Sequence, residues 1–189
     1  MNKKRLWTVL SFMAAVLLVG GGLAYMRLYD GHDLASQTRL VERACKQKVT
    51  LYSSTILEPH GPDSFKDSIR LAECTEIMEI HASDGRFGYA VFVQNEKGGS
   101  DLLVTNLYDK DAVVGRGFHG FGEQLYGIYQ CSKPDLERLV LTITNDETGE
   151  AITEECEMAG HNICVVKLPD FRESTIQSTF YDVHGNKFE

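Results

Sequence analysis

The sequence lacks most of the motifs that mark a catalytic or ligand-binding site. It has no G-x-S-x-G elbow for a serine nucleophile and no G-x-x-x-x-G-K-[ST] loop for a nucleotide phosphate. The histidines form no H-x-x-x-H pair and the cysteines no C-x-x-C pair, so the short ligand spacing of structural zinc is missing. The acidic turns do not match the calcium-binding loop of an EF-hand. We therefore expect no enzyme activity, no metal site and no cofactor.

Acidic residues are absent from the first 27 residues and in excess in the rest. The whole chain carries −8 and residues 1–27 carry +4, so residues 28–189 carry −12. A domain of this charge repels nucleic acid phosphates, which excludes nucleic acid as a partner. Its length suits one domain, or two small ones that share a core.

Charged side chains are also absent from residues 6–26, a run of 21 residues. A helix of that length crosses a hydrocarbon core of roughly 30 Å. Lys3, Lys4 and Arg5 precede the run, whereas only Arg27 follows it closely. The positive-inside rule therefore predicts a single-pass membrane protein with a cytoplasmic N-terminus and an extracytoplasmic C-terminal domain.

A cleaved signal peptide is the alternative interpretation of the same segment. Gly22-Leu23-Ala24 fits a small-x-small cleavage site, at which the signal peptide would be cleaved near Ala24. Cleavage would leave a secreted or periplasmic domain, for which small-ligand binding is the natural role. Against it, the apolar run continues well past Leu18.

Hydrophobic periodicity predicts one helix followed by strands. Asp33 is a suitable N-cap for a helix over 34–48, with Leu34, Val41 and Cys45 on one face. Residues 64–74 are ambiguous and could form a second short helix. From Thr75 onward the pattern has a period of two, typical of strands. The strands are expected over 77–80, 86–94, 102–108, 136–144, 163–168 and 175–183.

These elements predict an N-terminal transmembrane helix followed by a mainly β, antiparallel, sandwich-like ectodomain with one or two short helices. An α+β fold is the alternative. Turn signals about every ten residues favour a small sandwich over 136–189. The expected units are a cytoplasmic N-terminus (1–5), the membrane helix (6–26), a linker helix (27–50) and a β-rich domain (51–189), with a subdomain break near 132–135.

The cysteines all follow the membrane segment, where an oxidising compartment favours pairing. Cys156 and Cys164 flank a short stretch that suits a hairpin, so they are the first disulfide candidates. Cys45 and Cys74 form a second, weaker candidate pair, which leaves Cys131 over. Zinc binding by Cys156, His161 and Cys164 is disfavoured because a fourth local ligand is missing.

A glycine-rich run over 113–127 is the least regular part of the sequence. It predicts a loop or an irregular strand pair, and its aromatic residues have two interpretations. They could form an interaction loop for a partner, made by Phe118, His119, Phe121 and Tyr126, or they could fold back into the core, which the pattern favours.

These observations predict a membrane-anchored envelope protein whose ectodomain binds another protein. The partner, the ligand and the oligomeric state are left open by the sequence.

Overall fold

The computed structural model describes residues 21–22, 28–57, 75–121, 124–133, 135–158, 162–170 and 173–188. Of the predicted segment 6–26 only Gly21 and Gly22 fall in these ranges, so the membrane helix and the cleavage site at Ala24 lie outside them. Cys74 and the ambiguous stretch 64–74 lie outside them as well. Within the described ranges, no helix has the length and apolarity that a membrane crossing needs.

The described chain contains a helix of twelve residues and eleven strands. The helix is α2 (Leu34–Cys45). The strands are β1 (Val49–Leu57), β2 (Thr75–Ala82), β3 (Phe87–Gln94), β4 (Ser100–Tyr108), β5 (Val114–Phe121), β6 (Gln124–Cys131), β7 (Leu136–Asn145), β8 (Ala151–Glu157), β9 (Ile163–Lys167), β10 (Ser174–Asp182) and β11 (Lys187–Phe188).

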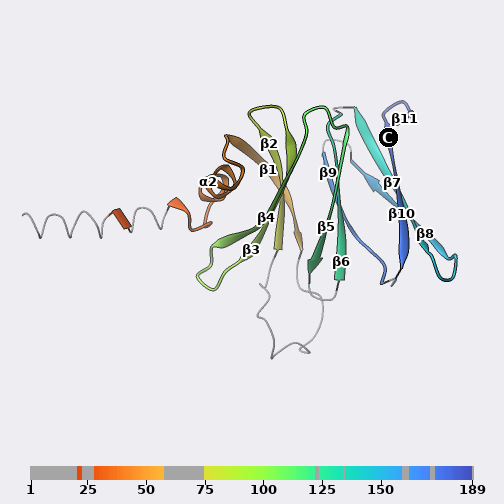
Figure 1. The fold of residues 1–189 in the computed structure, drawn as a ribbon, viewed down its shortest axis with the longest axis horizontal. Coiled ribbons are helices and arrows are strands. Elements are labelled where there is room, and N and C mark those ends of the chain that lie inside the picture. Colours follow the sequence, from red (N-terminus) through yellow and green to blue (C-terminus); the bar gives the residue numbers. More distant parts are fainter. Residues whose placement is uncertain are drawn as a thin grey trace, which may run out of the picture.

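The strands form three antiparallel sheets. The N-terminal sheet has the order β1-β2-β3-β4, the central sheet β5-β6-β9, and the C-terminal sheet β11-β10-β7-β8. Figure 1 shows them one after another from left to right, with α2 against the outer side of the N-terminal sheet. The prediction of a mainly β, antiparallel fold with a short helix is confirmed.

Helix α2 begins where the sequence predicts. The Asp33 carboxylate accepts a hydrogen bond from the Ser36 backbone N–H at 2.6 Å, and the Ser36 hydroxyl accepts one from the Asp33 N–H, which completes a capping box. The helix ends at Cys45, earlier than the predicted residue 48, because Lys46 adopts a left-handed conformation with φ of 56°.

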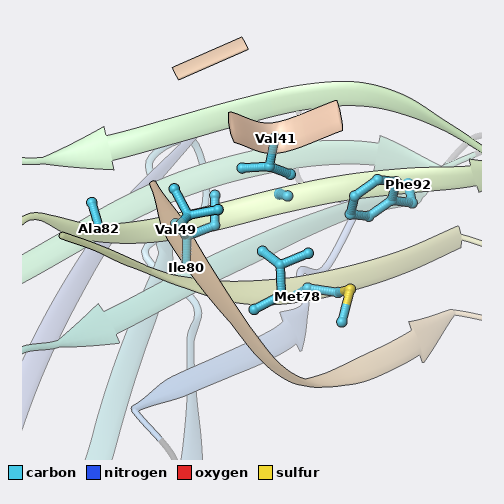
Figure 2. Close-up of a cluster of buried hydrophobic side chains, with 8 residues drawn as sticks. Val41, Val49, Met78, Ile80, Ala82 and Phe92 are labelled. Atoms are coloured by element: carbon cyan, nitrogen blue, oxygen red, sulfur yellow. The ribbon is translucent and has the colours of Figure 1, made fainter. Parts of the chain in front are cut away.

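Helix α2 is a packed layer of the domain. Val41 is fully buried and joins a cluster with residues from the face of the N-terminal sheet that is turned toward the helix (Figure 2). That cluster contains Val41, Val49, Leu51, Met78, Ile80, Ala82, Ala90 and Phe92. Leu34, predicted to share the buried face, is 52% exposed because it occupies the first helical position, at the rim of the contact.

The central sheet is covered on both faces. On β6, Tyr126 and Ile128 pack toward the N-terminal sheet, in a cluster with Ile77, Tyr89 and Val91. Since successive side chains of a strand point to opposite faces, the alternate residues of β6 face the other way. Tyr129 and Cys131 accordingly pack in the cluster that joins the central sheet to the C-terminal sheet.

The outer face of the C-terminal sheet is polar and needs no further layer. Arg138 forms an ion pair with Glu155, and its guanidinium carbon lies 4.6 Å from the centre of the Tyr181 ring. Strand β8, at the edge of the sheet, is mostly exposed and carries glutamates. The polar face completes the sequence of layers α2, N-terminal sheet, central sheet, C-terminal sheet.

The predicted sandwich over 136–189 is met only in part. Strands β7, β8, β10 and β11 form one sheet, but β9 pairs with β6 of the central sheet. The predicted break near 132–135 falls where the chain passes from the central to the C-terminal sheet, and the cluster of Leu136 with Tyr129 and Cys131 spans that point.

Replacement of Val41 by alanine tests the helix layer. Val41→Ala removes methyl groups from a fully buried site and should lower the free energy of unfolding by roughly 2 kcal/mol. Leu34→Ala, on the exposed part of the same helix, is the matched control and should change it by less than about 0.5 kcal/mol. Urea unfolding of both variants measures the difference, and equal effects would show that the helix does not contribute through Val41.

Candidate functional site

The glycine-rich run forms a regular antiparallel hairpin of β5 and β6. The register is continuous from Val114 opposite Cys131 to Phe121 opposite Gln124. Opposite residues of an antiparallel pair share a face of the sheet. The hairpin therefore has one face toward the N-terminal sheet and one toward the C-terminal sheet.

Two glycines of β5 let tyrosines of the N-terminal sheet lie directly on the strand. A Cβ atom at Gly117 would come within 2.1 Å of the Tyr89 hydroxyl, and one at Gly115 within 2.2 Å of the Tyr108 ring. Glycine is required at both positions because no other residue leaves room for the rings. The tyrosines hold the hairpin from behind, and burial raises the pKa of Tyr108.

Phe118 and Leu125 lie on the opposite face of the same hairpin. Phe118 is 55% exposed and Leu125 46% exposed. Phe118 pairs with Gly127 and Leu125 with Gly120, so the two side chains are diagonal neighbours on one face. They form an apolar surface that we name the hairpin patch, on the face opposite the bracing tyrosines.

The four residues of the predicted interaction loop are divided between the faces. His119 and Tyr126 are opposite each other in the register, on the face toward the N-terminal sheet. Tyr126 packs in the cluster with Ile128, and burial lowers the pKa of His119. Phe118 alone is described as exposed, while the side chain of Phe121 lies outside the described part.

The disulfide candidates Cys156 and Cys164 meet between two sheets. Cys156 lies on the edge strand β8 of the C-terminal sheet and Cys164 on the edge strand β9 of the central sheet. Both sulfurs are thiols in the structure, and each thiol shifts the pKa of the other. The two cysteines therefore lie on strands of two different sheets, and not on the two paired strands of one hairpin that the sequence suggests.

The other described cysteines, Cys45 and Cys131, form no thiol pair of this kind. Cys45 and Cys131 are free thiols, and Cys74, the predicted partner of Cys45, lies outside the described ranges. Among the described residues no group of three or more His, Cys, Asp or Glu side chains is placed to hold a metal ion. His161 is not described.

A groove of about 390 Å³ opens beside the thiol pair. Its walls come from the inward face of β8 and from β9 with the residues that follow it. The lining residues are Ile152, Glu154, Cys156, Val165, Val166, Lys167, Leu168 and Pro169. Solvent in the groove therefore reaches the Cys156 side chain.

A second groove, of about 580 Å³, lies against α2 and is lined by several basic residues. These cations have partners in the domain. Lys48 pairs with Glu42 at 3.1 Å, the Arg39 side chain donates to the Leu28 carbonyl at 2.6 Å, and Arg43 lies 5.6 Å from the centre of the Tyr29 ring. The groove is therefore a poor anion site.

A carboxylate–imidazole pair on β2 was missed by the sequence analysis. Glu79 is 7% exposed and its carboxylate contacts the ring of His81, while the Tyr52 ring lies 4.7 Å from the same imidazole. The spacing of Glu79 and His81 by two in a strand was the available signal, since such residues share a face. Neither of the two grooves is lined by these residues.

The bracing tyrosines were also missed as partners of the glycines. Gly115 and Gly117 alternate with larger residues at a period of two, which is a sign of a strand face that another layer approaches closely. The identity of the layer, Tyr89 and Tyr108, depends on how the sheets stack, and no local pattern shows that.

Comparisons with known proteins add no relative to this chain. No protein-family model matches it, and neither the curated proteins nor the solved structures give a match.

Gly117→Ala tests whether the tyrosine contact holds the hairpin. The added methyl overlaps the Tyr89 hydroxyl, and overpacking of this kind should lower the free energy of unfolding by roughly 1–3 kcal/mol. Gly120→Ala, on the same strand with open space at its Cβ, is the control and should cost much less. Tyr89→Phe combined with Gly117→Ala should recover part of the loss, because the nearest clashing atom is gone. Thermal and urea unfolding of the wild type and the three variants give their free energies of unfolding. Equal losses for Gly117→Ala and Gly120→Ala would contradict the bracing role.

Proposed function

We propose that the chain is a single-pass, membrane-anchored envelope protein whose extracytoplasmic β-rich domain binds another protein through the hairpin patch. The observation that carries this is the exposure of Phe118 and Leu125 on one face of a braced hairpin. Aromatic side chains held in a fixed position are the usual anchors of protein interfaces, because little conformational entropy is lost when they are covered.

The bracing separates this patch from scattered apolar exposure elsewhere on the domain. Leu103 is equally exposed, at 54%, but lies on the edge strand β4 of the N-terminal sheet. Phe118 lies on a strand whose other face is fixed by Tyr89 and Tyr108. The backbone that carries Phe118 is therefore held in place before a partner binds.

The charge of the domain indicates what kind of partner the patch suits. Residues 28–189 carry −12, and complementary charge speeds association and selects partners. The expected partner presents an apolar socket for Phe118 with a basic rim around it. The anchor at residues 6–26 would keep the domain at a membrane and raise its effective concentration toward a partner in the same membrane.

Small-ligand binding is the alternative function, and the groove between β8 and β9 favours it. A volume of about 390 Å³ falls in the range of small-molecule sites, and its walls combine apolar Ile152 and Val165 with charged Glu154 and Lys167. This groove is a separate site, because none of the residues of the hairpin patch or the bracing tyrosines lines it.

Substitution of Phe118 tests protein binding. A photo-crosslinking amino acid that replaces Phe118 in the full-length chain should form a discrete adduct with one protein in native membranes. When the crosslinker is placed at a nearby position instead, Phe118→Ser should reduce the yield of the adduct with that protein at least tenfold. Leu103→Ser is the matched control, since Leu103 has the same exposure on a different sheet. Both variants should keep the melting temperature of the wild type. Equal loss of the adduct in the two variants, or no adduct at position 118, would contradict the hairpin patch as the binding surface.

The intact mass of the protein from its native host tests the anchor. A mass that includes residues 1–24 and recovery in the membrane fraction after an alkaline wash are expected. A mass that lacks residues 1–24 would show that the segment is cleaved, and would favour the soluble, ligand-binding alternative.

A further inference from the structure

Cys156 and Cys164 come from two different sheets and meet at their edges. Cys156 is opposite Leu139 in the register of β8 with β7, and Cys164 is opposite Tyr129 in the register of β9 with β6. Both side chains pack against the same cluster between the central and the C-terminal sheet, and each thiol shifts the pKa of the other. The two sulfurs are therefore neighbours without any rearrangement of the strands.

The two thiols differ in their access to solvent. Cys156 lines the groove between β8 and β9, whereas Cys164 is not one of the groove's lining residues. The neighbouring Cys164 thiol lowers the pKa of Cys156, whereas the Cys156 thiol together with burial raises the pKa of Cys164. Cys156 is thus the thiol that ionises first and that a reagent in the groove reaches first.

Tyr129 adds a polar group to the same interior. Its side chain is 1% exposed, and its hydroxyl has no hydrogen-bond partner within the described residues. Burial raises its pKa and the two thiols add to the effect, so the hydroxyl stays protonated beside them.

We propose that Cys156 and Cys164 are a redox pair, which forms an inter-sheet disulfide by exchange with an organic disulfide that enters the groove, with Cys156 as the attacking thiolate and Cys164 as the resolving thiol. This proposal is independent of the hairpin patch. It assigns chemistry to a part of the domain that the proposed protein binding does not use.

The exchange takes two steps. The Cys156 thiolate attacks one sulfur of the oxidant R–S–S–R, the S–S bond breaks, and RS⁻ leaves, which gives a mixed disulfide on Cys156. Cys164 then gives its proton to solvent and attacks the Cys156 sulfur, and the second RS⁻ leaves. Each RS⁻ takes up a proton. Two protein thiols are oxidised by two electrons, and one organic disulfide is reduced to two thiols.

Cys131 is the third cysteine of the same cluster and stays outside this chemistry. It is fully buried, its sulfur accepts a hydrogen bond from the Lys133 backbone N–H at 3.5 Å, and burial raises its pKa. It does not line the groove. Cys131 is thus the internal control for labelling of the pair.

The test uses the full-length protein, purified in detergent and treated with glutathione disulfide. Iodoacetamide alkylation without reduction and tryptic mass spectrometry follow. Cys156 and Cys164 share the tryptic peptide 139–167, because no Lys or Arg lies between residues 138 and 167. The expected product is that peptide, unlabelled and lighter by two hydrogen atoms, while Cys131, on another peptide, is labelled only after unfolding. Labelling of both Cys156 and Cys164 after the oxidant, or a bond from either to Cys131, would overturn the proposal.

Single-cysteine variants test the order of attack. Cys164→Ser should accumulate a glutathione adduct on Cys156, and Cys156→Ser should form an adduct on Cys164 at least tenfold more slowly. Equal rates, or the reverse order, would overturn the assignment of Cys156 as the attacking thiol. Cys131→Ser, the matched control, should oxidise as the wild type does.

Thermal unfolding gives a readout that does not depend on the variants. The bridge links two layers across a short loop, and the oxidised wild type should melt roughly 5–10 °C above the reduced protein. The shift should vanish on addition of dithiothreitol. An unchanged or lowered melting temperature would show that the pair does not bond in the native geometry.

Discussion

The whole arrangement depends on a narrow sheet that is covered on both faces. Strands β5, β6 and β9 contribute alternate side chains to two different clusters, so one sheet of three strands binds the N-terminal and the C-terminal sheet to each other. Such a sheet tolerates few polar groups. Gln130 of β6 is fully buried, and its amide donates to the Gly88 carbonyl of β3 at 2.6 Å, so this buried polar side chain links two sheets.

Glycine is the feature that makes this close stacking possible on one side. At Gly115 and Gly117 the backbone itself forms the surface on which Tyr108 and Tyr89 lie. The interface between these two sheets therefore combines aromatic rings that lie on peptide groups with the aliphatic side chains of Ile77, Val91 and Ile128. The free energy comes from burial of large rings, and the small residue opposite prevents overlap.

The sequence predicts the parts that depend on local pattern. Asp33 marks the start of α2, and the alternation over 86–94 predicts β3, because capping and side-chain period act within a few residues. It does not predict β8, whose residues Ala151–Glu157 are polar and lack an alternating apolar pattern, as suits an exposed edge strand. Sheet membership is a longer-range property. Nothing near residue 163 indicates that β9 leaves its neighbours β8 and β10 and pairs with β6.

The candidate site shows the same division. The aromatic residues over 113–127 were found from composition, yet only the stacking of the sheets decides that Phe118 is exposed while Tyr126 is covered. The proximity of Cys156 to Cys164 was predicted from their short separation. Their position on two different sheets follows from the pairing of β9 with β6, which cannot be predicted from the separation of the two cysteines in the sequence.

The glutamates of β8 have a consequence for how copies of the protein behave toward one another. An unpaired strand edge offers free N–H and C=O groups to any passing strand, and two such edges from neighbouring molecules could join into a continuous ribbon. Glu154, Glu155 and Glu157 place like charges along this edge, so two copies that approach edge to edge repel each other before the backbones meet. That repulsion weakens as ionic strength shortens the Debye length. A strand that contributes little to the core thus opposes association of two copies through this edge.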